Sequence, residues 1–214
     1  MKEADLKRFT IAKLAGVLAA CSLLFSAASL CAAADDSFER YGVRIRGIYI
    51  MPDEKVDSRL SSLGIKVDDA VTPELDLEYF ITRNLSTELV LALSKHDIMI
   101  NNGGTNAGSL WLLPPSLYVK YHPLPQYRVS PYVGFGMNVV MPFDEKLTID
   151  PTFKVHTTLG WAAKVGADIK LIDHVYLNID AMYYDCRPDM TVAGTKYKLN
   201  LNPFIVGTGI GVRF

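Results

Sequence analysis

Four histidines in this 214-residue chain could act as the base of a hydrolytic site. A hydrolytic site needs such a base within hydrogen-bond reach of a nucleophile such as serine. No serine is placed convincingly beside a histidine in the sequence. We therefore interpret the four as rim residues, expect no catalytic residue, cofactor or metal site, and keep a lipid-hydrolysing enzyme as the weakest alternative. The histidines are His96, His122, His156 and His174.

Charged side chains recur at every second position in several segments, as in Arg44 with Arg46 and Asp76 with Glu78. This spacing places them on one face of a β-strand, where arginines and carboxylates of neighbouring strands can pair. The interior of an eight-stranded barrel is just wide enough for side chains to fill. We therefore predict a charged plug that closes the lumen and stabilises the barrel. The predicted plug comprises Arg44, Arg46, Asp76, Glu78, Glu88, Lys120, Lys164, Asp168, Asp180 and Arg213.

Inward positions become apolar toward the ends of the strands that carry the long loops. This predicts a small apolar pocket above the charged plug, although a slip of one residue in register would turn the same side chains outward. Pro114 and Pro115 lie within a predicted strand, where each proline removes one hydrogen-bond donor from the ladder. The pair predicts either a local break in the wall or a harmless bulge. The inward apolar residues are Ile48, Ile50, Leu110, Leu112, Val140 and Met182.

Eight strands would position these residues, and the connections between them alternate between short turns and long polar loops. Short turns on one rim and long loops on the other are typical of an outer-membrane barrel, whose strands need about 9–11 residues to cross. A soluble lipocalin-like barrel has no reason for this asymmetry. The sequence predicts an all-β, eight-stranded antiparallel transmembrane β-barrel. The predicted strands are 41–51, 72–80, 85–95, 109–122, 129–142, 156–171, 175–184 and 199–214.

The outward face of these strands carries almost no charge, as a lipid-facing surface requires, because a charge at the bilayer midplane costs about 2–4 kcal/mol. Tyr79, Tyr121, Tyr127 and Tyr132 lie near short turns, where amphipathic rings suit the membrane interface. For Tyr127 and Tyr132, ordinary packing against the turn is the alternative. The last strand ends on Phe214. An aromatic terminus of this kind is what the barrel assembly machinery reads.

The first residues predict a secretory signal peptide. A basic start is followed by the apolar run 14–30 and then by small residues up to Ala34, so we expect residues 1–34 to be cleaved and 35–214 to form the barrel domain. A rival cleavage before Cys21 would match a lipoprotein signal. Cleavage after Ala34 leaves Cys186 as the one cysteine, which cannot form an internal disulfide. The small net charge gives no basic face for nucleic acid.

Several segments resemble the outer membrane protein W (OmpW) family and occur in the order found there. The resemblance implies an eight-stranded barrel with an apolar channel in its extracellular half, passive carriage of small hydrophobic molecules, and sideways release into the membrane. A tryptophan that other members carry before Gly160 is replaced by Leu159, and the resemblance adds this leucine to the channel lining. The segments are RGIYIMP at 46–52, LLPPSL at 112–117, PYVGFGMN at 131–138, KVGAD at 164–168 and NPFIVG at 202–207.

We therefore expect a passive channel in the outer membrane of a Gram-negative cell, with extracellular loops and both termini on the periplasmic side. Its expected partners are outer-membrane lipids, small apolar solutes and, through Phe214, the assembly machinery. The main alternative is a structural or adhesive barrel that transports nothing.

Overall fold

The computed structural model describes residues 38–51, 54–56, 66–67, 69–100, 105–147, 154–192 and 195–214. The expected signal peptide, residues 1–34, therefore lies outside the described residues. None of the described residues belongs to a helix with the length and apolar character that a membrane crossing requires.

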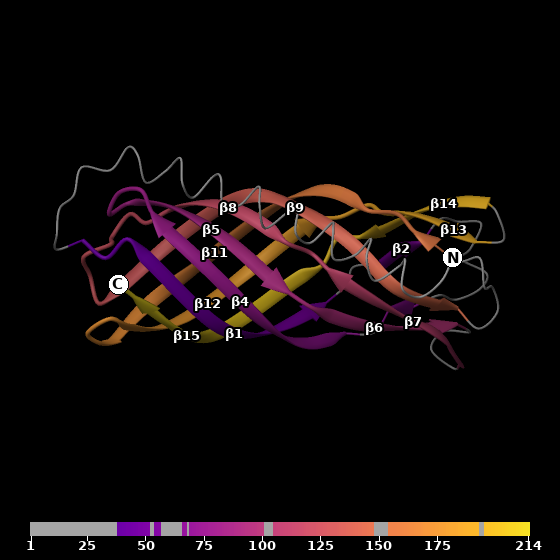
Figure 1. The fold of residues 1–214 in the computed structure, drawn as a ribbon, viewed down its shortest axis with the longest axis horizontal. Coiled ribbons are helices and arrows are strands. Elements are labelled where there is room, and N and C mark those ends of the chain that lie inside the picture. The colour runs from indigo at the N-terminus through magenta and orange to yellow at the C-terminus, as the bar shows by residue number, and fades with distance from the viewer. Residues whose placement is uncertain are drawn as a thin grey trace, which may run out of the picture. The chain divides into compact units, whose positions relative to one another are not determined.

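Eight antiparallel strands form a closed barrel, which confirms the predicted fold (Figure 1). Each barrel strand is hydrogen-bonded to the next one in chain order, and the last strand pairs with the first, so the ring has no open edge. The barrel strands are β1 (Tyr41–Met51), β4 (Ala70–Phe80), β5 (Leu85–Ala92), β8 (Ser116–Tyr121), β9 (Val129–Leu147), β11 (Thr158–Ile172), β12 (Val175–Asp185) and β15 (Phe204–Arg213).

Further strands extend the wall at the end opposite the C-terminus (Figure 1). There β6 and β7 continue the lines of β5 and β8, β3 pairs with β6, and β10, β13, β14 and β2 form a small separate sheet. These strands are β2 (Glu54–Val56), β3 (Lys66–Val67), β6 (Ser94–Ile100), β7 (Thr105–Leu113), β10 (Lys154–Val155), β13 (Asp189–Val192) and β14 (Thr195–Leu201).

Three of the predicted strands are divided in the structure. The predicted strand 109–122 is split at Pro114 and Pro115, and the predicted strand 199–214 is split at Asn202 and Pro203, because a proline has no N–H for the ladder. The predicted strand 85–95 is split at Leu93, where no proline occurs. The β9 strand also runs to Leu147, beyond the predicted end at residue 142.

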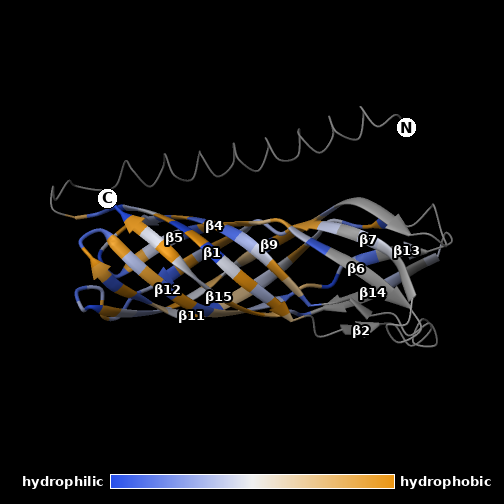
Figure 2. Ribbon diagram, turned by 90° about the horizontal axis from the view of Figure 1, so that it is seen from below, coloured by the Kyte–Doolittle hydropathy of each residue, from blue (hydrophilic) through white to orange (hydrophobic). Residues whose placement is uncertain are grey.

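Side chains of the barrel strands alternate between the lumen and the outer surface, as the period of two predicts. In β1 the buried Arg44 and Arg46 alternate with Ile45, whose side chain is 69% exposed. Figure 2 shows the corresponding bands of polar and apolar residues along the strands. The arginine stems lie over glycines of β15, because a Cβ added at Gly209 would come within 2.7 Å of Arg46 Cγ.

The two ends of the barrel chain meet at the rim that carries the short turns. The amide N–H groups of Tyr41 and Phe214 each donate to the other's carbonyl oxygen at 2.9 Å, and their rings stack. The Arg213 N–H donates to the carbonyl of His174, which lies in the turn between β11 and β12 with φ of 68°. The barrel is therefore closed by its terminal strands next to the shortest turn.

Candidate functional site

Two arginines of β1 form the centre of a buried charged cluster in the lumen. The Arg44 guanidinium donates to Glu78 at 2.6 Å and to Asp76 at 3.3 Å, and it also bonds Glu88 of β5. All four side chains are at most 4% exposed. Such buried charges are tolerated only when they are paired and hydrogen-bonded, which here requires strands β1, β4 and β5 to contribute together.

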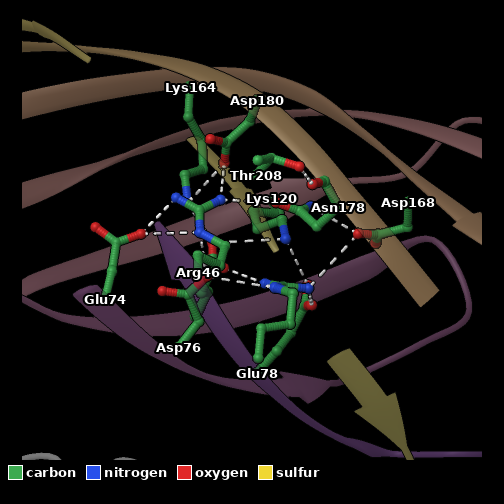
Figure 3. Close-up of polar contacts among 12 residues, drawn as sticks. Arg46, Glu74, Asp76, Glu78, Lys120, Lys164, Asp168, Asn178, Asp180 and Thr208 are labelled. Carbon is green, nitrogen blue, oxygen red and sulfur yellow. Dashed lines mark hydrogen bonds and ion pairs between the residues drawn. The ribbon is translucent and has the colours of Figure 1, made fainter. Parts of the chain in front are cut away.

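Arg46, two residues further along β1 than Arg44, makes a second set of contacts. Its guanidinium bonds the carboxylates of Glu74 and Asp180, and it donates to the Asn178 side-chain oxygen at 2.7 Å. Its Nε also lies 3.1 Å from a carboxylate oxygen of Asp76. Figure 3 shows Arg46 among the labelled side chains of these residues. The arginine therefore connects β4 to β12 across the barrel.

Two lysines from the opposite wall complete the cluster. The Lys120 ammonium lies 3.0 Å from Glu78, and the Lys164 ammonium lies 2.9 Å from Glu88 and 3.5 Å from Asp180. Each ammonium also lies over an aromatic ring, Lys120 at 3.9 Å from the Tyr132 centroid and Lys164 at 4.6 Å from that of Tyr118. Cation–π contacts of this kind add to the ion pairs.

The charged network extends toward the short-turn rim through Arg213 and Asp168. Their side chains form an ion pair, and the Asn178 amide donates to Asp168 at 2.7 Å. The Arg213 guanidinium also lies 4.5 Å from the Phe80 ring and 4.4 Å from the Tyr176 ring. Charged groups and rings therefore line the lumen from its middle down to this rim.

All the predicted plug residues lie in this cluster, and that they seal the lumen stays a prediction. Glu74 and Asn178 also belong to the cluster and were not predicted, although Glu74 shares the alternating face of Asp76 and could have been found from it. Of the two predicted places for Tyr132, the membrane interface is wrong, because its side chain is 1% exposed and its hydroxyl donates to Asp180 at 2.9 Å.

One histidine lies beside a serine and a glutamate inside the cluster. His122 is completely buried, with Nε2 3.2 Å from Ser86 Oγ and 3.3 Å from Glu78 Oε1, so its interpretation as a rim residue was wrong. The same glutamate oxygen accepts the serine hydroxyl at 2.5 Å. In a hydrolytic triad the acid holds the other imidazole nitrogen and the serine faces substrate. Here the acid and serine share one nitrogen within a closed ion-pair network, an arrangement that suits packing.

Two of the other histidines lie outside this group. His156 Nε2 lies 3.1 Å from Thr191 Oγ1, and His174 Nδ1 lies 2.7 Å from Glu39, both at exposed positions. The His96 side chain lies outside the described residues.

An apolar cluster occupies the lumen above the charged network, toward the long loops. Ile48 and Met182, both predicted lining residues, are 2% and 1% exposed within it, and the sulfur of Met182 touches the Arg46 guanidinium at 3.9 Å. This contact marks where the apolar cluster meets the charged plug. The cluster comprises Ile48, Ile50, Val90, Ala92, Tyr118, Ala162, Met182, Tyr184 and Ile205.

The remaining predicted lining residues differ in where they lie. Val140 is inward and 3% exposed, Leu112 is half-buried, and the Leu110 side chain lies outside the described residues. The placement of Leu159 in the lining was wrong, because its side chain is 66% exposed and its strand partner is the outward Val139. Because Leu159 is two residues before the outward Trp161, the alternation along the strand would have placed it on the outer surface.

The wall beside the apolar cluster has a gap in its hydrogen-bond ladder. Val90 pairs with Ser116 and Ser94 pairs with Leu112, but no pairing between the two strand lines joins residues 91–93 to 113–115 in this described part of the wall. Pro114 and Pro115 lie in this stretch and bring no N–H groups. The predicted interruption therefore affects two neighbouring strand lines, and we call it the ladder gap (residues 91–93 and 113–115).

Other groups satisfy several backbone carbonyls of the ladder gap. The Thr72 hydroxyl donates to the Leu93 carbonyl at 2.5 Å, and the Val139 N–H donates to the Pro115 carbonyl at 3.0 Å. The Ser116 hydroxyl donates to the Pro114 carbonyl at 3.1 Å. The gap is therefore held by bonds to its flanks, while the direct bonds across it are missing.

Comparison with known proteins gives consistent matches over the barrel. A model of the OmpW family matches residues 42–214. Outer membrane protein W of Vibrio cholerae is 30% identical over 183 residues, which cover 77% of this chain and 84% of that protein. An uncharacterized outer-membrane protein of Sinorhizobium fredii, y4mB, is 27% identical over 180 residues, covering 80% and 79%. The crystal structure of OprG from Pseudomonas aeruginosa has the same fold, with a TM-score of 0.71 at 22% identity over 82% of this chain and 96% of that chain.

Proposed function

Because the chain belongs to the OmpW family and is an outer-membrane β-barrel, we propose that it is a channel for the passive uptake of small hydrophobic molecules. The observation that carries the proposal is the apolar cluster in the upper lumen, which lies directly above a plug of paired charges. A barrel that only needed a stable interior could continue the charged network to the top. An apolar upper half instead suits a solute that leaves water, at about 25 cal/mol per Å² of apolar surface buried.

The direction of passage follows from the two halves of the lumen. A solute that enters from the long-loop end, which we place outside the cell, meets Arg46 and the rest of the plug below the apolar cluster. Opening the plug would break buried ion pairs, which is costly. The ladder gap lies in the wall at the level of the apolar cluster, since Val90 and Ala92 belong to that cluster. We place the exit there, sideways into the membrane, with both termini on the periplasmic side.

The proposal is tested by measuring the equilibrium binding of an apolar probe. Ethylbenzene is titrated into the barrel in lipid nanodiscs, with empty nanodiscs subtracted, and we expect saturable binding. Ile48→Asp or Leu112→Asp places a carboxylate in the path and should abolish it, because an unpaired charge is strongly disfavoured there. Ile48→Val, which keeps the surface apolar, is the matched control and should retain binding. Unchanged binding in both aspartate variants, with the barrel folded, would contradict the assignment of the lining.

The alternative functions predict different results, one in this titration and the other in an assay of lipid hydrolysis. A structural or adhesive barrel would show no saturable binding by the wild-type protein and no change in any variant. An enzyme acting on lipid would hydrolyse lipid A or phospholipid and lose that activity in His96→Ala.

The route to the membrane is also part of the proposal. We place signal cleavage after Ala34, so the mass of the mature protein should correspond to a chain that begins at Asp35. A lipid-modified chain that begins at Cys21 would contradict this. At the other end, Phe214 stacks on Tyr41 at the closing seam, and we propose that the assembly machinery binds this terminal residue before the seam closes.

A further inference from the structure

The side-chain carboxamide of Asn138, in the apolar half of the lumen, lacks a hydrogen-bond partner among the described residues. Asn138 is completely buried on the inward face of β9, and among the described residues neither its Nδ2 nor its Oδ1 has a hydrogen bond. A buried carboxamide that bonds nothing is disfavoured, since it has lost its water without replacement. The charged plug does not use this residue, so it calls for a separate explanation.

The position of Asn138 is defined by the register of three strands. It pairs with Ser116 on β8 and with Gly160 on β11, and the absence of a side chain at Gly160 leaves room for the carboxamide. Two residues further down β9, Gly136 pairs with Tyr118 and Ala162 of the apolar cluster. Asn138 therefore lies within the upper, apolar part of the lumen.

The lysines of the two neighbouring strands pair with a lower position on β9 than Asn138. Lys120 and Lys164 flank Gly134, four residues before Asn138 along β9, and both ammonium groups already contact carboxylates. A charged head group beside Asn138 would thus be desolvated without a counter-ion, which is strongly unfavourable. A neutral group, such as a carbonyl or a hydroxyl, needs only the bonds that a carboxamide can offer.

Two further polar groups and the ladder gap lie next to the same position. The Ser116 hydroxyl is 3.2 Å from the Tyr184 hydroxyl and donates to the Pro114 carbonyl, and the Val139 N–H bonds Pro115. A head group held by Asn138 would therefore be positioned beside the interruption in the wall.

We infer that Asn138 is the polar anchor for the neutral head group of an otherwise apolar solute. Its Nδ2–H donates to a carbonyl, or its Oδ1 accepts from a hydroxyl, while the hydrocarbon part lies among the side chains of the apolar cluster. The inference rests on the proposed function and narrows it, because it makes neutral molecules with one hydrogen-bonding group better ligands than pure hydrocarbons of the same shape.

The test compares two probes of the same skeleton, ethylbenzene and acetophenone, in which a carbonyl replaces one methylene. Each is titrated into wild-type and Asn138→Leu barrels in nanodiscs, and the ratio of the two association constants is measured after subtraction of partitioning into lipid. We expect the variant to lose roughly 3- to 10-fold in affinity for acetophenone, the effect of one net hydrogen bond. Its affinity for ethylbenzene should be unchanged or higher.

Two controls keep the result decisive. Asn138→Ala removes the carboxamide without adding bulk and serves if Asn138→Leu does not fold, whereas Val140→Ala trims the next inward side chain and should weaken both probes alike. Binding of both probes with an unchanged ratio in the Asn138 variants would overturn the anchor and leave the proposed channel standing. Failure of the wild-type barrel to bind either probe would overturn both.

Discussion

Replacing Arg44 by methionine should destabilise the barrel by about 3 kcal/mol, the lower end of the range for breaking a buried ion pair. Arg44 is 4% exposed and faces Asp76, Glu78 and Glu88. These acids are not left alone in the variant, because Arg46, Lys120 and Lys164 retain contacts with them. The lower end of the range therefore applies. Methionine keeps the length of the stem over Gly211, so little packing is lost.

The charge balance of the cluster supports the direction of this effect. Acidic groups already outnumber basic ones in the described cluster, and loss of Arg44 increases the excess of buried negative charge. The basic members are Arg44, Arg46, Lys120, Lys164 and Arg213, and the acidic members are Glu74, Asp76, Glu78, Glu88, Asp168 and Asp180.

The assay is the free energy of unfolding in urea, with the barrel in lipid vesicles and tryptophan fluorescence as the signal. Arg187→Met is the matched control, because Arg187 pairs with Asp185 at 2.8 Å but its side chain is 64% exposed. An exposed pair of this kind contributes about 0–1 kcal/mol. The reasoning would be refuted if Arg44→Met and Arg187→Met lowered the free energy of unfolding equally.

Two further predictions concern a close approach and a buried thiol. Gly209→Ala should lower the free energy of unfolding by about 1–3 kcal/mol, because the added Cβ would lie 2.6 Å from Arg46 Cα. Gly47 has open space around it, so Gly47→Ala should change the free energy of unfolding by less than about 0.5 kcal/mol. Equal effects of the two variants in urea titrations would count against the packing argument. Burial raises the pKa of the Cys186 thiol to about 12, so little reactive thiolate exists at pH 8. Mass spectrometry should show slower maleimide labelling there than at an exposed Gln126→Cys thiol, and equal rates would mean that Cys186 is accessible.

Much of the barrel could be predicted because inward and outward residues alternate within the sequence of each strand. The faces of β1, with Arg44 inward and Ile45 outward, follow from counting alone. The break at Leu93 could not be predicted from its own residues. Its neighbour across the wall carries Pro114 and Pro115, so the cause lies on a different strand and depends on the register.

The interior contacts were predictable as a group but not as pairs. Ser86 and His122 are 36 residues apart in sequence and meet only because Ser86 pairs with Lys120, two residues before the histidine. That register is set by the tertiary structure. Leu159 shows the opposite failure, since the alternation places it outward and the resemblance to the family suggested otherwise.

Uptake across an intact outer membrane tests the central claim most directly. The rate of ethylbenzene uptake is measured in cells of a Gram-negative host that carry equal amounts of folded wild-type or Ile48→Asp barrel. The lipopolysaccharide leaflet slows apolar solutes, so a channel through the apolar cluster should raise the rate in wild-type cells above that of cells without the barrel. Ile48→Asp should return it to that background. Equal rates with wild-type, Ile48→Asp and no barrel would contradict the channel.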